Sequence, residues 1–273
     1  MKTPSTSSAD RLRDDLALAH ELADAADEIS MDRFLSADLV VESKADSSPV
    51  SDADTAVEQA LRDVLGARRP DDAVLGEESG ETGGGDRRWI LDPIDGTKNY
   101  VRGVPVWATL IALQEGGEVT VGLVSAPALG RRWWAARGLG AHTGGALART
   151  RRISVSGVGD LAEASVSYSS LAGWEKQGRL PGLLELSRQV WRTRAYGDFW
   201  CHLLVAEGAV DAAFEPEVSL WDLAPLQVVV EEAGGRFTDL SGAARPDGGS
   251  AVCTNGLLHD RVLEALRPSE PCP

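Results

Sequence analysis

Four acidic clusters mark the places where this chain could carry out chemistry, and each lies at a predicted boundary between secondary-structure elements. The most informative is the sequence DPIDGT at residues 92–97, which directly follows a short apolar segment. Pro93 favours an extended conformation at Asp92, and Gly96 permits a tight turn. The carboxylates of Asp92 and Asp95 can therefore face one point. The other clusters lie at residues 44–54, 76–79 and 221–225.

Oxygen ligands gathered in this way suit Mg²⁺, which binds through a few carboxylates and a substrate phosphate while keeping several waters. The carbonyl of Ile94 could join the two aspartates. A helical turn that begins at Gly96 and Thr97 would offer backbone N–H groups to a phosphate. The pattern therefore favours metal-assisted hydrolysis of a phosphate ester. Any one cluster alone could be a turn in which an aspartate caps local backbone, and the presence of four favours catalysis.

The composition argues against several other classes of function. Twenty-seven basic and 42 acidic residues give a net charge of −15, whereas proteins that bind nucleic acid or a membrane surface normally carry a basic face. No segment approaches the ~20 apolar residues of a membrane span, and the N-terminus lacks the apolar region of a signal peptide. Three cysteines without a C-x-x-C pair argue against a disulfide framework or a zinc site and favour a cytoplasmic location.

Hydrophobic periodicity predicts an α+β first half and an alternating α/β second half. The first half has helices at 10–34 and from about 54 to a stop at Gly66, then strands at 89–91, 106–113, 119–126 and 133–136. The second half has strands at 164–169, 210–214 and 236–239 and helices at 180–190, 199–208 and 221–233. We expect a flexible tail at 1–9, an N-terminal subdomain at 10–150, a C-terminal subdomain at 151–266 and a flexible tail at 267–273.

Together these clusters resemble the signature set of the inositol monophosphatase superfamily. The similarity rests on GEE at 76–78, DPIDGT at 92–97 and WDLA at 221–224, and it extends over roughly residues 10–265. It implies a layered αβαβα sandwich and a Mg²⁺-dependent phosphomonoesterase, of a kind that is often dimeric and lithium-sensitive. Pro225 replaces an alanine usual in the family, with little consequence expected because proline is tolerated in a first helical turn.

The resemblance also assigns roles to individual residues, with two or three Mg²⁺ ions per site. The implied metal ligands are Glu77, Asp92, the Ile94 carbonyl, Asp95 and Asp222. Gly96 and Thr97 would bind the phosphate. Thr97 and Glu77 would orient the attacking water, and Asp54 would support Thr97. The implied reaction is direct in-line attack by metal-activated water, without a phosphoenzyme.

The substrate is indicated by the sequence RAYGD at 194–198. Asp198 stands where inositol phosphatases usually have a small or hydroxyl residue, and it resembles the acidic residue of histidinol-phosphatases. Glu215 matches the position that contacts the substrate beyond its phosphate. Two carboxylates there suit the ammonium and imidazole groups of histidinol phosphate, and Arg194 is the third predicted substrate contact. Asp198 could instead pair with Arg194 or cap the following helix.

Within the superfamily the chain most resembles the actinobacterial type of histidinol-phosphatase. We therefore expect hydrolysis of L-histidinol phosphate, a step of histidine biosynthesis, by a cytoplasmic homodimer that acts on a small phosphomonoester and binds neither nucleic acid nor membrane. The alternatives are an inositol-1-monophosphatase of broad specificity and a non-catalytic regulator that binds metal or phosphate. The complete ligand set argues against the second.

Three further features receive a structural interpretation. The sequence GVGDLA at 157–162 fits a dinucleotide-binding pattern, but no acidic residue follows at the required distance, so a loop is expected. Cys201-His202 lies in an apolar helix and indicates core packing rather than a catalytic dyad. The eight tryptophans are expected mostly in the core, although Trp107 could line the pocket.

Overall fold

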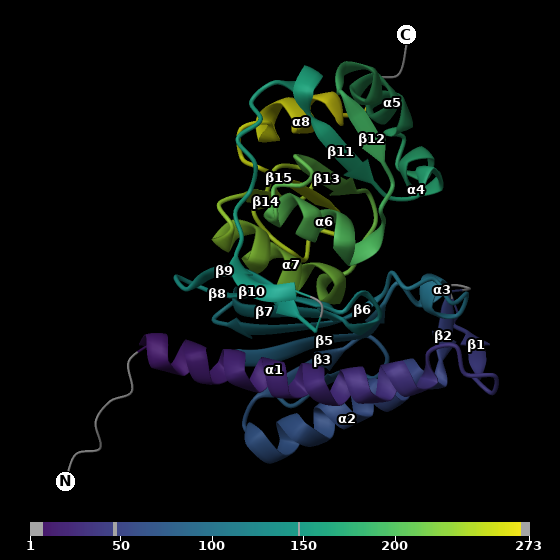
Figure 1. Ribbon diagram of the computed structural model, residues 1–273, viewed down its shortest axis with the longest axis vertical. Coiled ribbons are helices and arrows are strands. Elements are labelled where there is room, and N and C mark those ends of the chain that lie inside the picture. The colour runs from purple at the N-terminus through teal and green to yellow at the C-terminus, as the bar shows by residue number, and fades with distance from the viewer. Residues whose placement is uncertain (1–7, 46–47, 147, 269–273) are drawn as a thin grey trace.

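Five layers, alternately helical and sheet, make up the molecule in a computed structural model that describes residues 8–45, 48–146 and 148–268 (Figure 1). Helices lie below an eight-stranded sheet, further helices separate it from a five-stranded sheet, and others cover the far side of that smaller sheet. This is the predicted αβαβα order. Of the two predicted tails, residues 1–7 and 269–273 lie outside the described part. No helix in the described part has the length and apolarity that crossing a bilayer requires.

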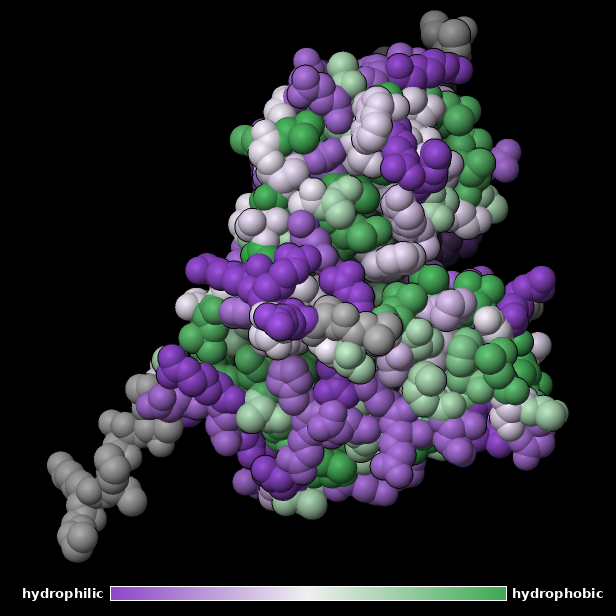
Figure 2. All heavy atoms as spheres, viewed as in Figure 1, coloured by the Kyte–Doolittle hydropathy of each residue, from purple (hydrophilic) through white to green (hydrophobic). Residues whose placement is uncertain are grey.

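The first layer consists of α1 (Ser8–Arg33) and α2 (Asp52–Arg68), which bury apolar side chains such as Leu22 and Leu61 against the larger sheet. Hydrophilic side chains cover much of their outward face (Figure 2). Helix α2 continues past Gly66, so the predicted stop there is wrong. An exposed glycine inside a helix costs only about 1 kcal/mol relative to alanine, which the buried face of α2 offsets.

The eight-stranded sheet forms the second layer, with the order β10-β9-β8-β7-β6-β5-β3-β4. Every pair is antiparallel except β3 with β5, which are parallel. The expected pairing of strands 106–113 and 119–126 is confirmed by β6 and β7. The strands are β3 (Ala73–Gly76), β4 (Gly80–Thr82), β5 (Arg87–Asp95), β6 (Ala108–Glu115), β7 (Glu118–Ala126), β8 (Arg131–Ala136), β9 (Gly140–Gly145) and β10 (Ala148–Arg152).

Short elements lie near the end of β5, at the DPIDGT sequence. A two-stranded hairpin, β1 (Val41–Ser43) with β2 (Pro49–Ser51), precedes α2, and the single turn α3 (Thr97–Tyr100) follows β5. Two 3₁₀ turns lie at Pro127–Leu129 and Leu161–Glu163. Residues 153–160 have no regular structure, as expected for the loop at the discounted dinucleotide pattern.

The second half of the chain builds the remaining layers. The five-stranded sheet has the order β12-β11-β13-β15-β14, with β11 parallel to both of its neighbours. Its strands are β11 (Ser165–Tyr168), β12 (Arg192–Arg194), β13 (Ala212–Glu215), β14 (Arg236–Thr238) and β15 (Ala251–Thr254). The middle helices are α6 (Asp198–Ala206) and α7 (Leu220–Glu232), and the outer ones are α4 (Leu171–Lys176), α5 (Leu180–Gln189) and α8 (His259–Ala265).

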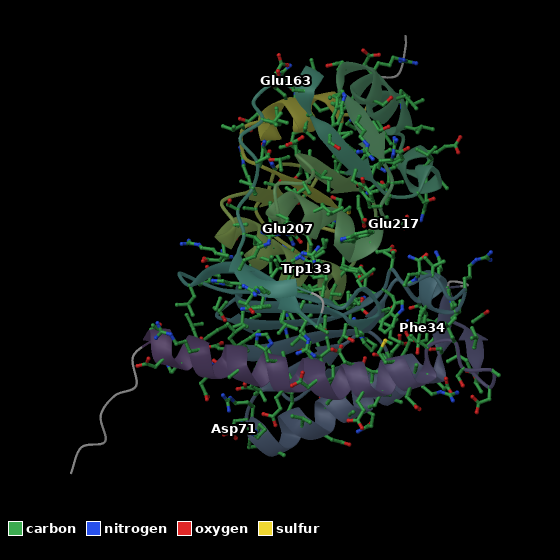
Figure 3. All side chains as sticks on the ribbon, in the orientation of Figure 1. Phe34, Asp71, Trp133, Glu163, Glu207 and Glu217 are labelled. Carbon is green, nitrogen blue, oxygen red and sulfur yellow. The ribbon has the colours of Figure 1, made fainter. Side chains whose placement is uncertain are left out.

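Two contacts fix the middle helices to the larger sheet. A Cβ added to Gly122 of β7 would lie 2.6 Å from the Pro225 carbonyl oxygen, so only glycine permits α7 to approach this closely. Pro225 is the sixth residue of α7 and lies beyond the first turn expected for it. After α6, Glu207 accepts hydrogen bonds from Trp133 and Arg131 of β8 (Figure 3).

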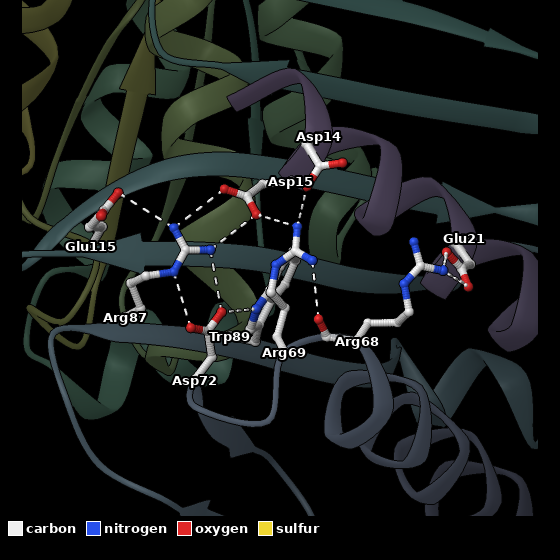
Figure 4. A network of polar contacts seen from close by, with 9 residues as sticks. All are labelled: Asp14, Asp15, Glu21, Arg68, Arg69, Asp72, Arg87, Trp89 and Glu115. Carbon is white, nitrogen blue, oxygen red and sulfur yellow. Dashed lines mark hydrogen bonds and ion pairs between the residues drawn. The ribbon is translucent and has the colours of Figure 1, made fainter. Parts of the chain in front are cut away.

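A network of ion pairs ties the first helix layer to the sheet (Figure 4). Arg87 of β5 lies 3.0 Å from Asp15 of α1 and 3.1 Å from Asp72. Arg69, directly after α2, lies 3.1 Å from the same Asp15 carboxylate. Asp15 therefore holds together two guanidinium groups from different elements.

Replacement of Asp15 by alanine should lower the free energy of unfolding by about 2–3 kcal/mol, because two partly buried guanidinium groups lose a shared partner. Asp14→Ala is the matched control: the side chain of Asp14 is 70% exposed against 5% for Asp15, so its loss should cost less than about 0.5 kcal/mol. Urea denaturation measures both values. Equal losses would contradict the proposed importance of the buried pair.

Candidate active site

A bulge in β5 brings the two aspartates of DPIDGT to one side of the strand. In a regular strand, side chains three residues apart point to opposite faces. Here Asp92 pairs with Leu110 and Asp95 with Ala108 of β6, so three steps along β5 match two along its partner. A bulge of this kind re-aims the side chains that follow it. As a result Asp92 and Asp95 contribute to one cluster.

The parallel pairing of β3 with β5 places Glu77 beside that cluster. Glu77 directly follows β3, and its N–H donates to the Leu91 carbonyl (3.1 Å). The buried Glu58 of α2 holds the turn from below, accepting the N–H groups of Glu78 (2.8 Å) and Ser79 (3.0 Å). Sequence reasoning missed Glu58, because its partners come from a distant segment.

Two capping boxes, one at the start of α2 and one at the start of α7, position two further carboxylates. The N–H of Ser51 donates to Asp54 Oδ2 (2.8 Å), and the N–H of Ser219 donates to Asp222 Oδ2 (2.7 Å). In both helices a serine at the N-cap is followed by an aspartate three residues later. The free N–H groups of a helix start thereby fix the orientation of each carboxylate.

Thr97 connects this arrangement to the turn after β5. Its Oγ1 lies 2.9 Å from the Ile94 carbonyl oxygen and 3.2 Å from Asp54 Oδ1. Gly96, at φ +81°, makes the turn possible, since a Cβ there would crowd the Val106 carbonyl at 3.1 Å. The helical turn expected at Gly96 and Thr97 is present as α3.

The assembled cluster has the chemistry of a cation site. Asp92, Asp95 and Asp222 each place a carboxylate oxygen within 4.8 Å of the others. Asp92 is buried, and its Oδ1 has no hydrogen-bond partner. An unpartnered buried carboxylate oxygen surrounded by other carboxylates is costly unless a cation neutralises it. The donor set therefore fits a divalent oxygen-seeking metal.

The same crowding perturbs the titration of these groups. Burial, followed by the charges of Glu77 and Asp95, raises the pKa of Asp92 well above its usual range. Burial is also the largest cause of the raised pKa of Asp95 and of Asp222, which reaches about 6. Without a metal, burial and mutual repulsion therefore favour the protonated form of each group, and a bound cation would favour the ionised form instead.

A cavity of about 780 Å³ opens onto this cluster and is lined by residues from both halves of the chain. Lys44 enters from the hairpin, with Nζ 2.8 Å from both Glu77 and Glu78. Asp198 and Glu215 line it on the side of the smaller sheet. Lys44 belongs to one of the acidic clusters, but sequence reasoning gave it no separate role.

Asp198 adopts neither of the structural alternatives considered for it. It is the first residue of α6 at φ +47°, while Gly197 takes the N-cap position. Its Oδ2 accepts a hydrogen bond from Asn99 (3.1 Å), another residue that sequence reasoning missed. A non-glycine residue at positive φ is uncommon, and here it directs a carboxylate into the cavity.

The structure does not bring Arg194 to this cavity. Arg194 ends the edge strand β12, is exposed, and donates to the Thr193 carbonyl (2.7 Å). Its predicted role as a substrate contact stays a prediction, because its side chain is not among those that line the cavity in this structure. Trp107 also lies elsewhere, fully buried against Phe34 and Tyr100.

Comparison with known proteins agrees with this geometry. A model of the inositol monophosphatase family matches residues 11–270. The chain belongs to this family. Histidinol-phosphatases of Streptomyces coelicolor and Mycobacterium tuberculosis are similar to it, each with 60% identity over 93% of this chain and over 97% and 98% of their own lengths.

The solved structure of an inositol monophosphatase from Thermotoga maritima has the same fold as this chain. It superposes with a TM-score of 0.83 at 31% identity, over 93% of this chain and 96% of its own. The αβαβα sandwich implied by the sequence resemblance is thereby confirmed. The roles of individual residues of the present chain are proposals and are developed below.

Removal of one charge from the cluster should raise the stability of the metal-free protein but abolish its activity. Asp92→Asn should abolish phosphatase activity. Without metal near pH 7.5, however, the variant should melt at least about 2 °C above the wild type, because the repulsion between the remaining carboxylates falls. That shift corresponds to roughly 1 kcal/mol. Since burial raises the pKa of Asp222 to about 6, its destabilising charge develops as pH rises from about 4 through 6. Mg²⁺ should therefore raise the wild-type melting temperature more at about pH 7.5 than at about pH 5.

The exposed Asp71→Asn serves as the control for this experiment and should change neither property. Differential scanning fluorimetry with and without Mg²⁺, together with a phosphate-release assay, measures all outcomes. Full activity of Asp92→Asn at saturating Mg²⁺ would contradict the site assignment.

Proposed function

We propose that this chain hydrolyses L-histidinol phosphate to L-histidinol and inorganic phosphate. The observation that carries the proposal is the position of Asp198 and Glu215, two carboxylates in the cavity that also contains the acidic cluster. A phosphate at the cluster would leave the organic part of the substrate facing them. An ammonium group and an imidazole that can be protonated complement two carboxylates, whereas a neutral polyol does not.

The relatives at 60% identity support this choice of substrate, because they are histidinol-phosphatases aligned over nearly their whole length. An inositol-1-monophosphatase of broad specificity is the second candidate, favoured by the inositol monophosphatases at lower identity. The non-catalytic alternative requires a missing ligand, whereas the acidic residues of the cluster are all present. The homodimer and the cytoplasmic location stay predictions.

Membership of the family implies a divalent metal, and we propose Mg²⁺. The proposed ligands are Glu77, Asp92, the Ile94 carbonyl, Asp95 and Asp222. Four carboxylates carry more charge than one dication neutralises, and this supports two or three ions per site. When bound, Mg²⁺ would lower the pKa of a water and offset the charge that develops on the phosphate and on the departing oxygen.

The protein's own groups would orient the attacking water. Asp54 uses Oδ2 to accept from the N–H and hydroxyl of Ser51, which leaves Oδ1 for the hydroxyl of Thr97. A Thr97 hydroxyl that donates to Asp54 has lone pairs free to accept from a water. Glu77 is the proposed second acceptor for that water. Together they would align the water oxygen with the phosphorus, opposite the ester bond that breaks.

The phosphate itself would lie at the turn after β5, against the backbone of Gly96 and Thr97. Gly96 lacks a side chain at the point where the turn approaches Asp198 Oδ2, 3.3 Å from where a Cβ would stand. The carboxylates of Asp198 and Glu215 would then contact the histidinol moiety.

Thr97→Ala should lower kcat by roughly 10²–10⁴-fold with little change in KM, because an aligned proton acceptor acts mainly in the transition state. Thr97→Ser keeps the hydroxyl and should retain most of the activity. Steady-state kinetics at saturating Mg²⁺ measures both variants. A change in KM alone for Thr97→Ala would mean that Thr97 only binds substrate.

Neutralisation of the substrate-facing carboxylates should reduce the preference for histidinol phosphate over other phosphomonoesters. Glu215→Gln and Asp198→Asn should each reduce kcat/KM for histidinol phosphate by about tenfold to a hundredfold, the worth of one charge-assisted hydrogen bond. Hydrolysis of inositol 1-phosphate and p-nitrophenyl phosphate should change little. Glu217→Gln is the matched control, since Glu217 pairs with Lys176 and is 53% exposed.

Parallel assays of the wild type and these variants on the three substrates test the proposal. Equal losses on every substrate would make the two carboxylates structural and favour the inositol-1-monophosphatase alternative. A wild type without preference for histidinol phosphate would refute the proposed substrate while leaving the phosphatase site intact.

A further inference from the structure

Three chemically different metal-binding side chains meet beside the cavity, apart from the oxygen cluster. Cys201 and His202 come from α6, and Glu215 comes from the end of β13. All three are buried, and each places one donor atom within 4.8 Å of the others. Glu215 Oε1 lies 3.8 Å from Cys201 Sγ and 3.9 Å from His202 Nε2.

His202 is the observation that indicates a ligand. Its side chain is only 1% exposed, yet neither ring nitrogen has a hydrogen-bond partner. Burying a polar group without a partner is unfavourable, and buried imidazoles are normally hydrogen-bonded or bound to metal. The ring lies at the wall of the cavity, with Nε2 facing the Glu215 carboxylate.

We propose that Cys201, His202 and Glu215 bind one Zn²⁺ ion at a site separate from the Mg²⁺ cluster. Sulfur and imidazole nitrogen are ligands that Zn²⁺ accepts readily and Mg²⁺ does not. Three protein ligands leave a fourth position for water. The site therefore discriminates between the two metals by donor chemistry.

The spacing of the donors fits such an ion after a small contraction. Zn–S and Zn–O bonds of about 2.3 and 2.0 Å at tetrahedral angles separate the two ligand atoms by about 3.5 Å. The sulfur–oxygen distance of 3.8 Å is close to this value. The nitrogen–oxygen distance of 3.9 Å is also within reach, so changes of side-chain torsion angles could bring the donors to coordination distance.

Protonation states agree with a site that is neutral until metal enters. Burial lowers the pKa of His202 to about 4, so the imidazole is neutral and its lone pair is available. Burial raises the pKa of Cys201 well above its usual range, so the thiol keeps its proton without metal. Burial also raises the pKa of Glu215 well above its usual range, so its carboxyl keeps a proton too. On binding, the thiol and the carboxyl would each release one proton to solvent, and thiolate plus carboxylate would balance the charge of Zn²⁺.

Occupation of this site would inhibit the proposed reaction. Glu215 cannot bind Zn²⁺ and the histidinol moiety with the same oxygen, so the ion would compete with substrate. This consequence rests on the proposed function, but the metal site itself does not. The sequence argument against zinc rests on the absence of C-x-x-C spacing, and it does not address a site in which two ligands are adjacent on a helix and the third comes from a strand.

Cobalt substitution tests the site independently of activity. Co²⁺ added to the metal-free protein should produce the intense near-ultraviolet absorption of a cobalt–thiolate bond. Cys201→Ala should abolish this absorption, and His202→Asn should weaken cobalt binding at least tenfold, since even indirect supporting groups are worth that much. Cys253→Ala is the matched control, because Cys253 is equally buried but lies outside the trio. It should keep the absorption.

Zinc inhibition provides the second readout. With Mg²⁺ saturating, half-inhibition of the wild type and Cys253→Ala should need at least tenfold less Zn²⁺ than half-inhibition of Cys201→Ala. Should Cys201→Ala fail to fold, His202→Asn carries the binding test. A thiolate absorption that is absent from the wild type, persists in Cys201→Ala or disappears in Cys253→Ala would overturn the proposal. Loss of histidinol phosphate preference alone would overturn only the proposed function.

Discussion

Repulsion between buried carboxylates is the constraint on which the rest of this structure depends. Asp92, Asp95 and Asp222 bring oxygens within 4.8 Å of one another although burial already disfavours each charge. Three carboxylates that repel one another do not stay close on their own, so the surrounding fold must hold them in place. The apolar layers on both faces of the larger sheet supply the stabilising free energy, and a divalent cation would remove the repulsion.

The restraint is applied by backbone groups more than by other side chains. Asp54 and Asp222 each use one oxygen to complete a capping box. The bulge in β5 turns Asp95 to the same side as Asp92, and the parallel partner β3 places Glu77 beside them. Because backbone N–H groups must be satisfied in any folded state, the same hydrogen bonds that begin two helices also orient the chemistry. Local folding and site geometry are therefore inseparable here.

Sequence reasoning succeeded where the information was local and failed where it depended on packing. The long first helix and the β6–β7 hairpin follow from periodicity within a few residues. The roles of Glu58 and Asn99 depend on segments that only the tertiary fold brings near, so neither gives a local signal. Arg194 was grouped with Asp198 by proximity along the chain, but the edge strand directs it outward. The positive φ of Asp198 likewise has no sequence signature, since that conformation usually belongs to glycine.

The contact of α7 with Gly122 also bears on which ions the site can accept. The Pro225 backbone and the Val228 side chain both lie against Gly122 and leave no room for a Cβ there, so the helix that carries Asp222 cannot come closer to the strand. The contact with Gly122 therefore limits how close Asp222 can come to the aspartates of β5. Selection between Mg²⁺ and Ca²⁺ depends on how far a ligand cage can expand, because the larger ion needs longer bonds and more ligands. A single missing methyl group, in a strand that supplies none of the proposed metal ligands, would thus limit the size of ion that fits the site.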